Sequence, residues 1–134
     1  MNPIRSSEPI VIPSTRTDDT LASRMETCGQ SFQVYVWEGS GPDYLHVHYA
    51  DDEAWHVLEG SLTFRFADKT VEAAAGTTVF VPAGTPHTYC ETNGRSRYLM
   101  ILTPRLRALI DKLHATPYAQ HGVVMQEFQS EILS

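Results

Sequence analysis

Three histidines and one glutamate occur at spacings that can bring their side chains to one point. His46 and His48 are two residues apart in a strand-like run, so both imidazoles are expected on the same face. Glu53 follows a four-residue turn and opens the next run, and His87 begins a later one after a turn rich in proline and glycine. Three imidazoles and a carboxylate form a nitrogen and oxygen ligand set that suits a divalent first-row metal. The absence of sulfur from this set disfavours a structural zinc–thiolate site.

Short predicted strands surround these four residues. Runs rich in aromatic and β-branched residues recur at 32–37, 44–49, 54–58, 62–66, 77–81, 87–90 and 97–102, mostly separated by glycine- or proline-containing turns. Within 62–66 the apolar residues alternate, which places Leu62, Phe64 and Phe66 on one face. Many short strands without intervening helices are typical of an antiparallel sandwich or barrel, so residues 31–102 are predicted to form an all-β barrel. Residues 1–30 are predicted to form an N-terminal arm with edge strands, because prolines flank the apolar segment at 10–12.

The pattern changes to a helical one at Thr103. Thr103 and Pro104 supply an N-cap and a proline at the first helical position. Apolar residues then recur at helical spacing, at Leu106, Leu109, Ile110 and Leu113, and Pro117 is expected to end the helix. A further short helix is expected to end near Gly122, and 123–133 is ambiguous between strand and helix. Residues 103–134 are therefore predicted to form a short helical tail on the same domain.

Two blocks of this sequence resemble the two motifs of the cupin superfamily. The first block matches with His46, His48, Glu53 and Gly60, although Gly41 stands one residue closer than the family pattern has it. The second block matches with Gly76, Pro82, Gly84 and His87, but Glu91 occupies the usual asparagine position. That asparagine is not a metal ligand in the family, so the departure concerns turn structure. The resemblance implies a double-stranded β-helix, or jelly roll, that holds one metal ion (Fe, Mn, Ni, Co, Cu or Zn) on His46, His48, Glu53 and His87.

The resemblance also suggests a class of activity. The chain is similar to small single-domain cupins of the quercetin 2,3-dioxygenase type, which implies an oxygenase acting on a small phenolic, enolic or diketone substrate. Glu53 would then be both ligand and catalytic base. A non-enzymatic ligand-binding module is the alternative, as is an isomerase, decarboxylase or cyclase that uses the same metal site. Four aromatic residues are candidates to line the pocket, with core packing an equal alternative for each: Tyr44, Trp55, Phe64 and Tyr89.

Composition limits the partners that are expected. The 134 residues carry a net charge of −6, which leaves no electrostatic footprint for nucleic acid. No signal peptide or membrane span is apparent, so the expected location is the cytoplasm. Only Arg65 and Arg97 are basic residues on predicted strands, which disfavours a sugar-phosphate isomerase. The apolar segment at 10–12 favours a homodimer paired through the barrel edge.

The remaining polar residues are given structural interpretations. His56 is out of phase with Glu53 and is expected to point outward. His114 and His121 are expected on the surface, and Asp51 and Asp52 in a solvated turn that makes the barrel mouth acidic. Cys90 is expected to be a small buried residue, and the two cysteines of the chain, at 28 and 90, fit no zinc pattern.

Overall fold

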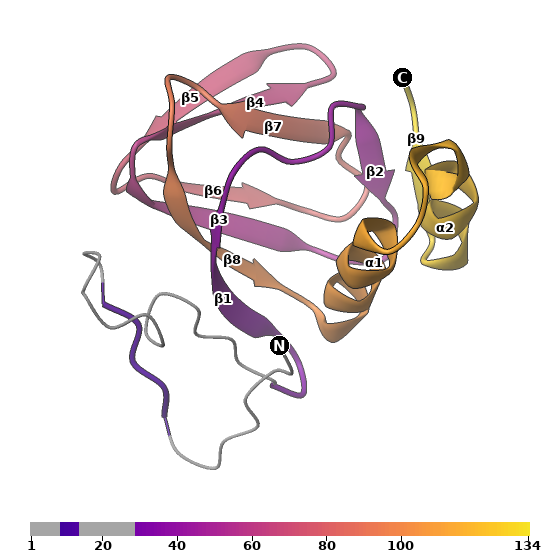
Figure 1. Ribbon diagram of the computed structural model, residues 1–134, viewed down its shortest axis with the longest axis horizontal. Helices are drawn as coiled ribbons and strands as arrows, with labels where there is room; N and C mark the ends of the chain where they lie inside the picture. Colours follow the sequence, from indigo (N-terminus) through magenta and orange to yellow (C-terminus); the bar gives the residue numbers. More distant parts are fainter. Residues whose placement is uncertain (1–8, 14–28) are drawn as a thin grey trace.

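Two antiparallel sheets face each other and enclose the core of the protein (Figure 1). The computed structural model describes residues 9–13 and 29–134. One sheet has the strand order β1-β8-β3-β6, made of β1 (Gln33–Glu38), β8 (Arg97–Leu102), β3 (Glu53–Glu59) and β6 (Thr78–Val81). The other has the order β5-β4-β7-β2-β9, made of β5 (Thr70–Ala74), β4 (Ser61–Phe66), β7 (His87–Glu91), β2 (His46–His48) and β9 (Ser130–Ile132). This arrangement confirms the predicted jelly roll with a short helical tail.

Alternation along the strands explains how the core forms. On β3 the side chains of Glu53, Trp55 and Val57 are buried while their neighbours are half-buried. On β4 the buried positions are Leu62 and Phe64, on the face that the alternating pattern predicts. Because neighbouring strands repeat this pattern, one face of each sheet supplies the shared apolar core.

The seven predicted runs each contain a strand, and within residues 29–134 there are two further strands that were not predicted. β5 has the sequence TVEAA, in which two alanines and a glutamate weaken the strand signal. β9 is three residues long and lies in the segment whose pattern was ambiguous. It forms because it pairs with β2, a contact between residues more than eighty positions apart.

The C-terminal tail begins with the predicted helix. α1 (Pro104–His114) starts with Thr103 as its N-cap, and the Thr103 side chain accepts a hydrogen bond from the backbone N–H of Leu106. A short 3₁₀ helix, η2 (Tyr118–Gln120), follows Pro117 and leads into α2 (His121–Glu127). Gly122 therefore lies inside a helix, and the expectation that it ends one is wrong. Figure 1 shows this helical tail beside the end of the barrel where β2 and β9 lie.

Two expectations about individual residues, Cys90 and Asp51, are also wrong, and of the predicted N-terminal arm the structure describes only residues 9–13 and 29–30. Residues 9–13 form no strand, in keeping with prolines that fix φ and donate no hydrogen bond; residues 1–8 and 14–28, with Cys28, lie outside the described residues. Cys90 is exposed, because it lies on the outer face of β7 opposite Thr63. Asp51 is 5% exposed rather than solvated, since it accepts a hydrogen bond from Thr103 Oγ1 and pairs with Arg105 at 3.0 Å. In the described part of the chain, every helix is too short or too polar to cross a membrane.

Candidate metal centre

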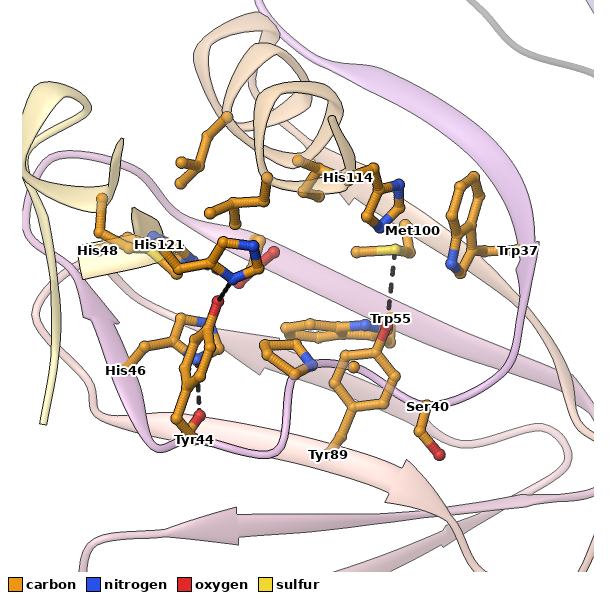
Figure 2. Close-up of a pocket in the computed structure, with 17 residues that line it drawn as sticks. Trp37, Ser40, Tyr44, His46, His48, Trp55, Tyr89, Met100, His114 and His121 are labelled. Carbon is orange, nitrogen blue, oxygen red and sulfur yellow. Dashed lines mark hydrogen bonds and ion pairs between the residues drawn. The ribbon is translucent and has the colours of Figure 1, made fainter. Parts of the chain in front are cut away.

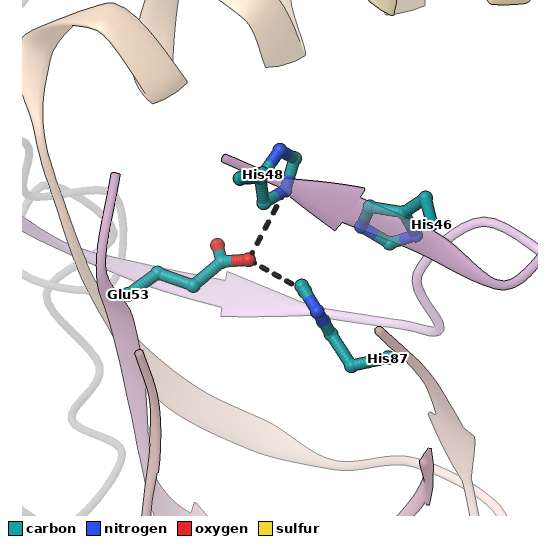
Figure 3. Close-up of side chains that lie close together, drawn as sticks. All are labelled: His46, His48, Glu53 and His87. Atoms are coloured by element: carbon teal, nitrogen blue, oxygen red, sulfur yellow. Dashed lines mark hydrogen bonds and ion pairs between the residues drawn. The ribbon is translucent and has the colours of Figure 1, made fainter. Parts of the chain in front are cut away.

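The three histidines and the glutamate of the sequence pattern meet between the two sheets (Figure 3). His46 and His87 are direct cross-strand partners on β2 and β7, and His48 is two residues further along β2. Glu53 reaches the same point from β3 in the opposite sheet. One ligand atom from each of the four residues lies within 4.8 Å of the others, and all four residues are buried.

Each of the three histidines makes a hydrogen bond through Nδ1. His46 Nδ1 donates to the backbone carbonyl of Tyr44 at 3.2 Å, and His87 Nδ1 donates to that of Thr85 at 2.9 Å. Since a carbonyl can only accept, both rings carry their proton on Nδ1. His48 Nδ1 lies 2.8 Å from the hydroxyl of Ser130.

The Ser130 hydroxyl fixes the same tautomer in His48. Its Oγ donates to the Phe128 carbonyl at 3.1 Å, so it is free to accept from His48. All three rings therefore present an unprotonated Nε2 when they are neutral. An Nδ1–H held by an oxygen acceptor is the usual support for a metal-ligating histidine.

The Nε2 atoms converge on the carboxylate of Glu53. Glu53 Oε1 lies 2.7 Å from His87 Nε2 and 3.3 Å from His48 Nε2. With Nδ1 protonated, these atoms are all acceptors, and acceptors this close require a cation or a proton between them. The residues present thus fit a bound divalent metal by their chemistry as well as by their number.

The pKa values of His46 and Glu53 both lie below their usual ranges, which favours the neutral imidazole and the ionised carboxylate that a metal ion requires. Desolvation, with smaller effects of His87 and His48, lowers the pKa of His46 to about 3. Burial alone would raise the pKa of Glu53, but the hydrogen bonds and positive charge that arise when a proton lies between its carboxylate and the Nε2 atoms of His48 and His87 outweigh burial and hold that pKa below its usual range. A neutral His46 and an ionised Glu53 are therefore expected at neutral pH.

A pocket of about 250 Å³ opens beside the cluster (Figure 2). Its lining comes from both the barrel and the tail. The barrel and its loops contribute Trp37, Ser40, Gly41, Pro42, Tyr44, His46, His48, Glu53, Trp55, Tyr89 and Met100. The tail contributes Leu109, Ile110, Leu113, His114, His121 and Met125. None of these lining residues is a lysine or an arginine.

Three of the four predicted aromatic residues line this pocket. Tyr44, Trp55 and Tyr89 are part of its wall, whereas Phe64 is fully buried and lies outside it. Phe64 packs against Trp55 with ring centroids 5.1 Å apart and against Tyr89 at 5.4 Å. It therefore supports the aromatic wall from behind.

Two tail histidines that were expected on the surface also border the pocket. His114 is exposed as expected, but its ring stacks on Trp37 with centroids 5.7 Å apart. His121 is half-buried and its Nδ1 lies 3.0 Å from the Tyr44 hydroxyl, so its surface interpretation is wrong. No periodic signal marks His121 in the sequence, because its position depends on how α2 folds back over the barrel.

The motif positions that are not ligands have structural roles. Gly60 has φ +76°, and a Cβ there would lie 2.5 Å from the Arg95 carbonyl oxygen, so only glycine fits this turn. Glu91, at the usual asparagine position, accepts hydrogen bonds from the backbone N–H and the hydroxyl of Ser96, at 2.7 and 2.9 Å. It thereby closes the turn between β7 and β8. His56 bonds to Thr78 Oγ1 at 2.8 Å, away from the ligand cluster.

Comparison with known proteins identifies the fold independently. The family model described as the cupin domain matches residues 32–102, more than half of the chain. A cupin-2 domain protein from Shewanella frigidimarina is 24% identical, with a TM-score of 0.51 over 56% of this chain and 72% of its own. A protein from Neisseria meningitidis is 22% identical, with a TM-score of 0.51 over 58% of this chain and 80% of its own. These likenesses show the fold, and none of the curated proteins matches the chain.

Proposed function

Because the chain belongs to the cupin domain family, we propose that it is a metal-dependent oxygenase acting on a small phenolic, enolic or diketone substrate. The observation that carries the proposal is the convergence of three imidazoles and one carboxylate beside a mainly apolar pocket, whose wall includes His46, His48 and Glu53. Such a site would hold one divalent first-row metal on His46, His48, Glu53 and His87.

The bound metal would supply Lewis acidity and an open position for oxygen ligands. The protein supplies access for the substrate and the surroundings of the site. His46, His48 and Glu53 all line the pocket, so a ligand can reach them from one side. Side chains of α1 and α2 form part of the wall on this side, and a site partly shielded from water in this way would have stronger electrostatic interactions.

The lining indicates what kind of molecule fits. Aromatic and aliphatic side chains dominate the wall, and the absence of lysine and arginine from it leaves no partner for a phosphate group. The volume of about 250 Å³ corresponds to about eight water molecules, so the substrate is a small one. A flat, mainly apolar molecule with an acidic hydroxyl meets these conditions.

Glu53 is the residue proposed to accept the hydroxyl proton of the substrate. Its Oε1 is turned toward His48 and His87, while a carboxylate has a second oxygen that can take a proton. A histidine that ligates through Nε2 and donates through Nδ1 has no such free position. The proposed base is therefore the one ligand with spare acceptor capacity.

The test combines metal loading with oxygen uptake. Metal-free protein is loaded in turn with Fe(II), Mn(II), Co(II), Ni(II), Cu(II) or Zn(II), and small phenols, enols and β-diketones are screened on an oxygen electrode. We expect at least one pair of metal and substrate to consume O₂. Glu53→Gln should then lower turnover by about 10²- to 10⁴-fold, the usual contribution of a general base, while Glu72→Gln on exposed β5 leaves it unchanged.

Two outcomes would overturn parts of the proposal. A Glu53→Gln protein that keeps its metal and its wild-type rate would remove the base assignment. If no compound consumes O₂ with any metal loaded, the oxygenase proposal fails, and a ligand-binding module or another cupin reaction takes its place.

A further inference from the structure

The tail places a polar group, His121, in the wall of the pocket next to the hydroxyl of Tyr44. His121, the first residue of α2, lies with its Nδ1 3.0 Å from the hydroxyl of Tyr44 (Figure 2). Both residues line the pocket. Neither belongs to the four-residue ligand cluster, and the motifs of the sequence do not include them.

The hydrogen bonds of His121 fix the direction of this contact. His121 Nε2 lies 3.0 Å from the backbone carbonyl of Thr116, which can only accept. The neutral ring therefore carries its proton on Nε2, and its Nδ1 accepts the proton of the Tyr44 hydroxyl. The chain of bonds runs from Tyr44 through His121 to Thr116.

This direction makes the Tyr44 oxygen an acceptor toward the pocket. Its only proton is committed to His121, whereas its lone pairs remain able to accept a hydrogen bond. Tyr44 is 4% exposed, so the acceptor is shielded from bulk water. A buried acceptor of this kind favours a ligand that brings its own donor and rejects one that does not.

The ring that carries the acceptor lies against a residue of the candidate metal cluster. Tyr44 precedes His46 by two residues, and their rings meet edge to face with centroids 5.8 Å apart. A ligand oxygen at the cluster and a second polar group at Tyr44 can therefore belong to one small molecule. The wall beside them is aromatic and carries no lysine or arginine.

We propose that Tyr44, oriented by His121, is a specificity-determining residue that selects ligands with a hydrogen-bond donor in addition to the oxygen that binds the metal. This inference rests on the proposed metal site and narrows its substrate class to small molecules with two polar groups, such as dihydroxy aromatic compounds. His121 acts as a positioning residue for Tyr44 and makes the C-terminal tail part of the binding site.

The experiment measures how strongly the protein prefers phenols that carry a second hydrogen-bond donor over matched phenols that lack one. Full-length protein is loaded with Co(II), and dissociation constants are obtained anaerobically from its visible absorption. The probes are resorcinol against 3-fluorophenol and hydroquinone against 4-fluorophenol, because fluorine is close to hydroxyl in size but donates nothing. We expect at least one diol to bind about tenfold or more tightly than its fluorinated partner.

Variants then test whether Tyr44 and His121 cause this preference for a second hydrogen-bond donor. Tyr44→Phe and His121→Leu should reduce it to within about twofold while cobalt content stays at the wild-type level. His121→Asn, which can return an acceptor near the Nδ1 position, should restore part of it. Tyr118→Phe is the matched control: its ring packs 5.9 Å from that of Tyr44, but its hydroxyl bonds to Asp43 and the residue is 65% exposed.

The two proposals fail in different ways. Absence of donor preference in the wild type, or an undiminished preference in Tyr44→Phe, overturns the role of Tyr44 and leaves the metal site standing. Failure to bind cobalt overturns the metal site and the inference with it. Failure of every phenol to perturb bound cobalt overturns the proposed substrate class and the inference, and leaves the metal site standing.

Discussion

Ser130 accepts a hydrogen bond from His48 at 2.8 Å, although 82 residues separate them. The contact exists because β9 pairs with β2, with Ser130 directly opposite His48. Ser130 is 3% exposed, so water cannot easily replace its hydroxyl. The tail therefore holds one of the candidate metal ligands in its binding tautomer.

Removing this hydroxyl should weaken metal binding without removing a ligand. We expect Ser130→Ala to lower metal affinity by about 10- to 100-fold, the usual effect of losing a partner behind a ligand. Competition with a chromophoric chelator measures the change. Thr78→Ala provides the control, because Thr78 makes the same 2.8 Å contact to His56, which is outside the cluster. Equal affinities in wild type and Ser130→Ala would show that the hydroxyl does not support the ligand.

Metal stoichiometry tests the ligand set itself. Wild-type protein dialysed after loading should keep about one equivalent of metal, and His48→Ala and His87→Ala should each keep far less, because each loses an Nε2 ligand. Elemental analysis measures the content. His56→Ala should behave as wild type, since His56 lies on the other face of β3. Wild-type content in both ligand variants would refute the assignment.

Gly60 should tolerate no side chain, for two separable reasons. Gly60→Ala introduces strain at φ +76° and a Cβ at 2.5 Å from the Arg95 carbonyl oxygen. Gly94→Ala introduces strain alone, because φ is +97° but no atom lies within 4 Å of a Cβ there. We expect losses in the free energy of unfolding of about 3 kcal/mol for the first and about 1 kcal/mol for the second, measured by urea denaturation. Equal losses would show that the close approach relaxes without cost.

The sequence predicted the elements and the candidate ligands whose signals are local. Alternation identified β4, and the cap at Thr103 with the stripe from Leu106 onward identified α1. His46, His48 and Glu53 were predicted to converge because fixed spacing within strands and a short turn determines where they point, which depends on chain geometry over a few residues. His87 was expected with them from its proline- and glycine-rich turn and from the resemblance to the second cupin motif, since its pairing with His46 joins residues 41 positions apart.

The features that were missed depend on contacts between distant parts of the chain. Asp51 looked like a solvated turn residue, but the start of α1 buries it through Thr103 and Arg105. His121 looked like a surface histidine until the fold of the tail placed it against Tyr44. β9 has too few residues to show a period and forms only by pairing with β2. Since each result depends on how the tail folds back over the barrel, local pattern could not reveal it.

Acid should destabilise the metal-free protein in a defined pH range. The pKa of His46 is lowered from 6.5 to about 3 in the folded state, so below pH 6.5 the unfolded chain binds a proton there that the folded chain does not. Stability from this group is therefore complete above pH 6.5 and falls as the pH drops toward 3. Glu53 acts in the same direction at lower pH, because its folded-state pKa is below the unfolded value of 4.5.

The size of the effect follows from proton linkage. His46 alone should remove up to about 1.4 kcal/mol of unfolding free energy for each pH unit below 6.5. Urea denaturation of metal-free protein at pH 7.5, 6.5, 5.5 and 4.5 measures it, and His46→Gln, which does not titrate, should flatten the part of the profile between pH 6.5 and 5.5. The wild type with excess Zn(II) should be more stable at pH 7.5 and should lose that extra stability on acidification, because protons compete for the Nε2 atoms. A profile for His46→Gln that matches the wild type across this range would show that His46 is not held neutral by burial.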